Sequence, residues 1–173
     1  MFQFLILAIV AVLVSIDQLT KWLAVLALPN LETTAIIPKI LGLCYVENRG
    51  AAFGILQGQR WFFLVVTAVV MAAILALLLF GNFRKHLLFN ISATLILAGG
   101  VGNFIDRAIH GYVVDFIKVL FFEFPVFNVA DCYVVVGSIL LLIFFFFVYD
   151  DKKDKVANKT EDTRGDDSTD RTN

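Results

Sequence analysis

The sequence predicts an all-α transmembrane bundle of four helices, accompanied by a small β-sheet outside the membrane. Of the 173 residues, 60% are hydrophobic and only 17% are charged, which is more apolar side chain than a water-soluble domain of this size could bury. Four segments each supply about 20 mainly apolar residues, the length that crosses a bilayer as a helix. One connecting segment has the composition of short strands.

The four apolar segments are expected to be helices because a membrane span must satisfy its backbone hydrogen bonds internally. The first has a few polar residues within it, whereas the second carries no charge. The first segment lacks the basic start and the small-x-small cleavage pattern of a secretory signal peptide, so we expect it to be retained. The spans run from about residue 2 to 28, 61 to 80, 87 to 105 and 130 to 149, within one domain covering residues 1–149.

The segments between and after the spans differ in composition. Residues 36–46 mix β-branched and aromatic side chains with Pro38 and Gly42, which favours short strands. Residues 150–173 are almost free of apolar side chains and are expected to form a disordered tail. An even number of spans places both termini on one side of the membrane, and the loop charges favour a cytoplasmic location for them only weakly.

Several classes of function have no support in the sequence. The formal net charge is -1, and no basic stripe with interleaved aromatic residues indicates nucleic-acid binding. Cys44 and Cys132 are too few for a disulfide scaffold and are expected to be buried or lipid-facing thiols. His86 and His110 are isolated, and the serines of the spans have no matching histidine. We therefore expect no metal, no cofactor and no Ser-His-Asp triad.

Two aspartates at the ends of apolar runs are the most informative residues. Asp115 follows the third span and Asp131 begins the fourth, and a carboxylate beside hydrocarbon is unfavourable unless it is paired, hydrated or used. The topology places both at the same membrane boundary. If they lie close together they share one proton, a state that suits hydrolysis. Each also has a structural interpretation: Asp131 as a helix N-cap, and Asp115 as a turn or strand residue facing water.

Polar residues elsewhere could complete such a site. In the run 99–107, three glycines allow close helix packing, and Asn103, Asp106 and Arg107 fall about one helical turn apart. These three residues are equally consistent with a helix end anchored at the interface. Asn48, which precedes several small residues, indicates a turn or a re-entrant loop, and its amide could bind a peptide backbone.

Asp17 and Lys21 lie within the first span, four residues apart in the order that favours an ion pair on a helix. Such a pair lowers the free-energy cost of placing two charges near lipid, and Trp22 suits the membrane interface. We expect this pair to brace the site and to take no part in the reaction.

Together these motifs resemble the lipoprotein signal peptidases, the type II signal peptidases of bacteria. The resemblance rests on Asp-Gln-x-Thr-Lys, Asn-x-Gly-Ala-Ala-Phe-Gly, Gly-Gly-x-Gly-Asn-x-x-Asp-Arg, Val-Val-Asp-Phe and Phe-Asn-x-Ala-Asp, which begin here at residues 17, 48, 99, 113 and 127. It implies an aspartic endopeptidase of the inner membrane with both termini cytoplasmic and an extracytoplasmic β-sheet cradle. The family removes signal peptides from prolipoproteins, cutting just before a cysteine that carries a diacylglyceryl group.

The resemblance also implies residue roles. The family's catalytic pair falls on Asp115 and Asp131, and its polar pair in the first helix falls on Asp17 and Lys21. Its supporting and substrate-binding positions fall on Asn48, Asn103, Arg107 and Asn128, with Asp106 nearby. The implied partners are diacylglyceryl-modified prolipoproteins and membrane lipids, and a monomer is expected.

Three alternatives compete with this interpretation. A small proton-coupled transporter is the main one, but transporters tend to hold substrate near the bilayer midplane, whereas these acids lie at span ends. A purely structural membrane protein would not need so many boundary carboxylates and amides. A presenilin-type Gly-x-Gly-Asp protease matches at residues 100–102, but Asn103 stands where the aspartate is required.

Overall fold

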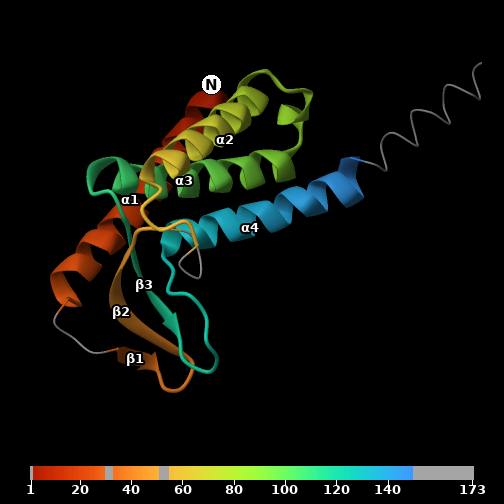
Figure 1. Ribbon diagram of the computed structural model, residues 1–173. Coiled ribbons are helices and arrows are strands. Elements are labelled where there is room, and N and C mark those ends of the chain that lie inside the picture. The colour runs from red at the N-terminus through yellow and green to blue at the C-terminus, as the bar shows by residue number, and fades with distance from the viewer. Residues whose placement is uncertain (1, 30–32, 51–54, 150–173) are drawn as a thin grey trace, which may run out of the picture.

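The computed structural model describes residues 2–29, 33–50 and 55–149, and it contains four long helices (Figure 1). All four are long and apolar enough to cross a membrane. A 3-10 turn, η2 (Asn82–Lys85), joins the second helix to the third. The helices are α1 (Phe2–Ala27), α2 (Arg60–Phe80), α3 (Leu87–Ile109) and α4 (Val129–Ile143), the last continuing as the π-helix η3 (Phe144–Tyr149).

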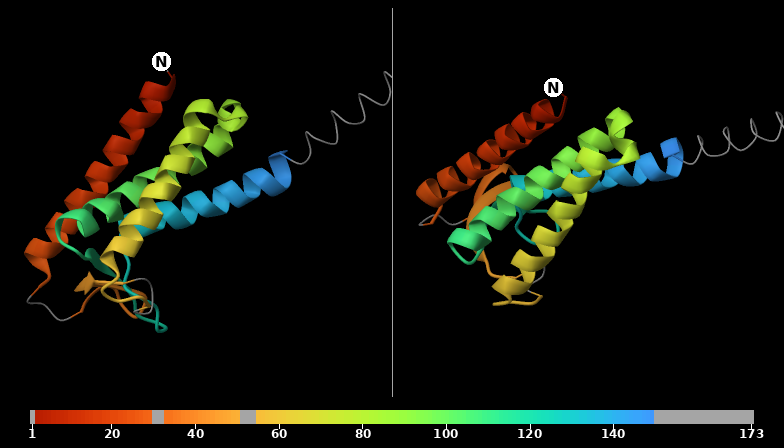
Figure 2. Two further views of the ribbon diagram at one scale, coloured as in Figure 1. Left: turned by 45° about the horizontal axis from the view of Figure 1, so that its top comes forward. Right: turned by 90° about the horizontal axis from the view of Figure 1, so that it is seen from above.

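Helix α3 is the centre of the bundle. Half of its most apolar stretch is buried, against at most 17% for the other three helices. The helices α1, α2 and α4 each pack against it (Figure 2). The other helices expose large apolar side chains along much of their length, as expected for surfaces that face lipid. Polar side chains of the bundle are therefore best sheltered around α3.

Glycines let the helices approach α3 closely, as small residues do in membrane proteins. A Cβ at Gly99 would overlap the backbone carbonyl of Ala130 in α4, and one at Gly102 would overlap the Asp17 carboxylate in α1. On the α4 side, a Cβ at Gly137 would lie 2.8 Å from the carbonyl oxygen of Ser92. The absent side chains thus set how near α1 and α4 come to α3.

Three strands form a small antiparallel sheet in the order β1-β2-β3. They are β1 (Thr34–Ile37), β2 (Leu41–Asn48) and β3 (Val113–Val119). The sheet lies beyond the end of the bundle where α1 and α3 end and α2 and α4 begin (Figure 1). The expected fold class, four apolar helices with a small sheet, is confirmed.

The sheet is fixed to the bundle by apolar packing and by a backbone bridge. Ala24 and Leu28 at the end of α1 are buried against Val114 and Phe116 of β3. The segment leading into α4 pairs with the same strand, because the Phe127 N–H donates to the Ile117 carbonyl at 3.1 Å and the Ile117 N–H donates back at 2.8 Å. The start of α4 is therefore held beside β3.

One predicted boundary needs correction. The third span was expected to end near Ile105, but α3 continues to Ile109, so Asp106 and Arg107 lie inside the helix. Hydropathy does not mark this helix end because both charged side chains have partners within the protein. The fourth helix begins at Val129, with Asn128 as its N-cap. The expected tail, residues 150–173, lies outside the described part of the chain.

Candidate active site

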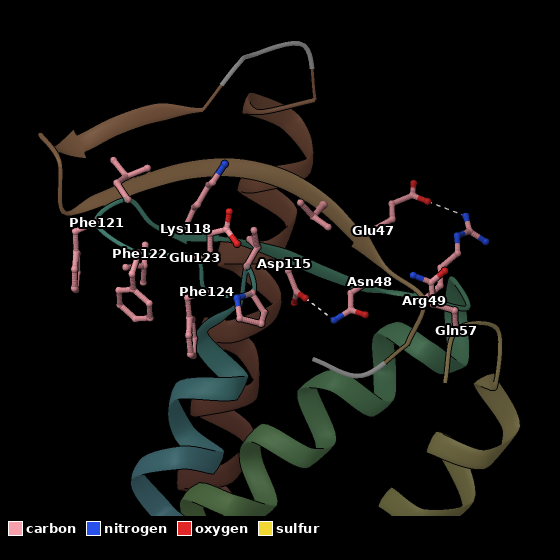
Figure 3. A pocket seen from close by; sticks show the side chains of 15 residues that line it. Glu47, Asn48, Arg49, Gln57, Asp115, Lys118, Phe121, Phe122, Glu123 and Phe124 are labelled. Atoms are coloured by element: carbon pink, nitrogen blue, oxygen red, sulfur yellow. Dashed lines mark hydrogen bonds and ion pairs between the residues drawn. The ribbon is translucent and has the colours of Figure 1, made fainter. Parts of the chain in front are cut away.

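Asp115 is a buried carboxylate on β3, with a relative exposure of 2%. Two side-chain amides donate to it: Asn48 Nδ2 to Oδ2 at 2.8 Å (Figure 3) and Asn128 Nδ2 to Oδ1 at 2.6 Å. Burial raises the pKa of Asp115 to about 6, and the charge of Asp131 acts in the same direction, while the two amides oppose the shift. The interpretation of Asp115 as a turn or strand residue facing water is therefore wrong, although it does lie on a strand.

Asp131 lies in the first turn of α4, where free N–H groups favour a carboxylate. It is not the N-cap, because Asn128 takes that position and the two residues form a capping box. Asn128 Oδ1 accepts from the Asp131 N–H at 3.0 Å, and Asp131 Oδ2 accepts from the Asn128 N–H at 3.1 Å. The other oxygen, Oδ1, accepts from Asn103 Nδ2 at 2.7 Å.

Asn128 links the two carboxylates. Its side-chain amide donates to Asp115 and its backbone N–H donates to Asp131, so one buried residue touches both acids. The same amide also donates to Asn103 Oδ1 at 3.1 Å. The structure therefore brings together Asp115 and Asp131, which the sequence separates by 16 positions, within reach of a single asparagine.

Lys21 orients the amide that contacts Asp131. Its ammonium donates to Asn103 Oδ1 at 2.9 Å, which leaves the Asn103 amide nitrogen facing Asp131. Lys21 also forms ion pairs with Asp17 at 2.9 Å and Asp106 at 3.0 Å, and all three side chains are at most 3% exposed. The expected ion pair between Asp17 and Lys21 is thus present, with Asp106 as a second anionic partner.

Asp17 and Asp106 also hold the two elements that carry Asp115 and Asp131. Asp17 Oδ1 accepts from the Ala130 N–H in α4 at 2.9 Å. Asp106 Oδ2 accepts from the Val114 N–H in β3 at 3.1 Å. Removing one partner of a buried ion pair is strongly destabilising, so this group ties α1, α3, β3 and α4 together just behind the carboxylates.

Gln18 is a polar residue of this group that the site prediction left out. Its Nε2 donates to Asp106 Oδ1 at 3.0 Å and to the Gly102 carbonyl at 3.1 Å. The sequence feature that could have identified Gln18 is its position, because an amide directly after Asp17 inside an apolar helix needs a partner.

Arg107 and Asn48 hold the chain where it leaves β2. Arg107 donates to the Gly50 carbonyl at 3.1 Å and lies 4.8 Å above the Phe63 ring. Asn48, the last residue of β2, accepts from the Gly50 N–H at 3.0 Å. The turn or re-entrant loop expected from residue 48 onward falls partly on residues 51–54, outside the described segments.

Two cavities meet the carboxylates from different sides. A hollow of about 840 Å³ beside the sheet is bordered by Asp115 and Asn48, and its wall includes three aromatic rings and a lysine (Figure 3): Phe121, Phe122, Phe124 and Lys118. A crevice of about 250 Å³ among α2, α3 and α4 is bordered by Asn103 and Asp131. Each acid thus faces its own cavity.

Metal ligation has no support in the described residues, where no group of three or more His, Cys, Asp or Glu side chains could hold an ion. The chemistry available from the described side chains is that of two neighbouring carboxylates with amide donors, which suits general acid and base catalysis.

Comparisons with known proteins agree with this chemistry. Residues 9–147 match the family model described as signal peptidase (SPase) II. Proteins named lipoprotein signal peptidase are similar: that of Streptococcus thermophilus is 44% identical, covering 74% of this chain and 83% of that protein. The protein of Enterococcus faecalis is 43% identical, covering 75% of this chain and 80% of that protein. The protein of Caldanaerobacter subterraneus is 45% identical, covering 78% of this chain and 90% of that protein.

Solved structures support the same relationship. Two structures of bacterial membrane enzymes superpose with a TM-score of 0.75 each, at 34% and 32% sequence identity. The matches cover 80% and 83% of this chain, and 85% and 93% of the other chains. These similarities, together with the four membrane-length helices, identify a multi-pass membrane peptidase of the aspartic type and not a transporter. The chain belongs to the signal peptidase II family.

Proposed function

We propose that this protein removes the signal peptide from diacylglyceryl-modified prolipoproteins by cutting just before the lipid-bearing cysteine. Asp115 and Asp131 are the catalytic residues of this proposal. The observation that carries it is the link through Asn128, which donates to both carboxylates. The membership in the signal peptidase II family supports the substrate class.

The chemistry assigns a different task to each acid. Asp115, whose pKa burial raises to about 6, is the member of the pair that holds the proton and donates it to the carbonyl oxygen of the scissile bond. Asp131 takes a proton from the attacking water and then passes it to the leaving nitrogen as the tetrahedral intermediate breaks down. In the same step Asp115 takes back the proton that it gave to the carbonyl oxygen, which restores both acids. Such a pair needs no metal or cofactor.

The remaining site residues have supporting roles in this proposal. Asn48, Asn103 and Asn128 hold the carboxylate oxygens in place through their amides. Arg107 holds the backbone beyond β2 near the site. Asp17, Lys21 and Asp106 brace the helices behind it.

We further propose that both termini are cytoplasmic and that the sheet lies on the outer side of the cytoplasmic membrane. The pair lies at the junction between the sheet and the apolar helices. A scissile bond at the boundary between a membrane-embedded signal helix and a water-exposed mature chain would reach the pair at this depth.

Cleavage of a purified prolipoprotein tests the proposal. The wild-type protein should cleave the diacylglyceryl-modified substrate and leave the unmodified precursor intact, as read on a gel. Asp115→Asn and Asp131→Asn should each lower the rate by at least about 10²-fold, because the first removes the general acid of the pair and the second removes the general base. Asp154→Asn, a carboxylate beyond the described residues, is the control and should keep the wild-type rate. Near wild-type cleavage by either site variant would refute the assignment.

A further inference from the structure

The crevice that borders Asp131 lies between α2 and α4, on the surface of α3. Its floor includes Gly99 and Gly100 of α3, which contribute backbone and no side chain to it. Its apolar walls include Val70, Met71 and Ile74 of α2 and Val134 of α4. The described part of the chain places no charged side chain in the crevice except Asp131 at its end.

The crevice is continuous with the catalytic pair. Its polar end is formed by Asn103 and Asp131, whereas Asp115 borders the other cavity, beside the sheet. A bond held between the two carboxylates would therefore have a water-facing hollow on one side and an apolar crevice on the other. A group attached within a few atoms of such a bond therefore has the crevice within its reach.

The size of the crevice limits its occupant. It extends along α2 from Val66 to Ile74, a rise of about 12 Å. A helical segment of that length would need roughly 900 Å³, taking a diameter of about 10 Å, but the crevice offers about 250 Å³. Its volume suits a single extended hydrocarbon chain.

The chemistry of the substrate indicates which hydrocarbon chain occupies the crevice. Under the proposed function, the cysteine that follows the scissile bond carries two acyl chains, so the inference rests on that function. Moving each methylene of these chains into water would cost about 0.8 kcal/mol. The hollow beside the sheet has charged groups on its wall, Glu47, Arg49 and Lys118, which suits a peptide better than an acyl chain.

We propose that one acyl chain of the diacylglyceryl group lies in the crevice, against Val70, Met71 and Val134, while the reaction takes place. The crevice keeps the chain in apolar surroundings while the cysteine to which it is attached reaches the catalytic pair. This subsite then contributes to recognition of the lipid on the substrate.

Two neighbouring valines of α2 provide a matched test. Val70 lines the crevice, whereas Val69 is 64% exposed on the lipid-facing surface and does not line it. In Val70→Trp the larger side chain fills the space and should raise KM for a substrate with two long acyl chains by about 10-fold or more. KM for a substrate with two four-carbon chains should stay unchanged. Val69→Trp should behave as wild type with both substrates.

Two results would overturn the proposal. One is a Val70→Trp protein that handles the long-chain substrate like Val69→Trp. The other is an equal loss on long and short chains, which would mean that the substitution disturbs the catalytic pair itself. Because wild-type cleavage is measured in the same series, failure of the subsite and failure of the proposed function are distinguishable.

Crosslinking locates the chain without requiring turnover. A substrate with a diazirine at the middle of an acyl chain, irradiated with the full-length Asp115→Asn, Asp131→Asn double variant, should label Met71, Ile74 and Val134. Adducts confined to residues 121–124, on the wall of the other cavity, would show that the chain lies beside the sheet and would refute the proposal.

Discussion

At the scale of single residues, the feature that matters most is the surroundings of Asp115. It is nearly inaccessible to water, yet both of its oxygens have an amide donor. The donors satisfy the carboxylate without supplying a positive charge, so they only partly offset the free-energy cost of burying the anion. The group consequently keeps a proton at a higher pH than an ordinary aspartate.

This balance predicts how stability depends on pH. The pKa of Asp115 is about 6 in the folded protein against 3.8 for the ordinary side chain. The folded state therefore holds a proton that the unfolded chain has released, and the stability from this group is complete below pH 3.8 and lost as the pH rises to about 6. A shift of this size corresponds to roughly 2–3 kcal/mol at most.

Asp115→Asn should reverse the order of stabilities across that range. At pH 7.5 the variant no longer buries an anion, but one neighbouring amide loses its acceptor, at about 1 kcal/mol; a net gain of about 1 kcal/mol remains. At pH 4 that gain is absent and the variant should be less stable than wild type. Thermal unfolding in detergent from pH 4 to 8 measures this. The exposed Glu123→Gln is the control, and parallel curves for Asp115→Asn and wild type would contradict the prediction.

At the scale of elements, α3 packs against its neighbours through two successive glycines, one facing α4 and the other facing α2. Gly99 lies against the first turn of α4, and Gly100 lies against Met71 and Thr67 of α2. Close packing on the α4 side is what positions Asp131, whereas the α2 side is looser and leaves the crevice.

A pair of alanine substitutions should separate these two contacts. In Gly99→Ala the new Cβ would overlap the Ala130 carbonyl and approach Val134 Cγ2 at 2.7 Å, so α4 must shift, at about 2–3 kcal/mol. In Gly100→Ala it meets the flexible Met71 side chain at 3.3 Å, and the higher helix propensity of alanine compensates. Thermal unfolding should show a clear loss for the first and little change for the second. Equal losses would show that both faces are packed equally tightly.

The sequence predicts some elements of this protein better than others. Long apolar runs locate the four helices because membrane length and composition are strong constraints. Strand β3 could not be assigned, since Val113–Phe116 are all buried and the alternation that marks a half-exposed strand is absent. The spacing of Asp17 and Lys21 predicts their pair, but the contacts of Lys21 with Asn103 and Asp106 depend on how α1 crosses α3. Spacing carries no information about that crossing.

At the scale of the whole molecule, the bundle and the sheet form two layers with the pair between them. Four spans return the chain to the side on which it started, so η2 lies at the end of the bundle away from the sheet (Figure 1). The two carboxylates thus lie at one end of the bundle, and the short connection between α2 and α3 lies at the other end.

Single cysteines should report this arrangement in spheroplasts. In a Cys44→Ser, Cys132→Ser background, Lys39→Cys in the turn between β1 and β2 should react with a membrane-impermeant maleimide. Lys85→Cys in η2 should react only after permeabilisation, because the proposed orientation makes that turn cytoplasmic. Both lysines are exposed, so access depends on the side of the membrane. The opposite labelling pattern would reverse the orientation, and labelling of both sites in sealed spheroplasts would contradict the four-span topology.

The link through Asn128 has a consequence for biogenesis. One acid comes from a strand of the outer layer and the other from a helix of the bundle, and the residue that joins them stands where the two layers meet. A nascent chain whose last helix has been inserted but whose strands have not yet docked has only isolated acids. Under the proposed function, the catalytic pair is therefore complete only in a molecule whose sheet and last helix have come together.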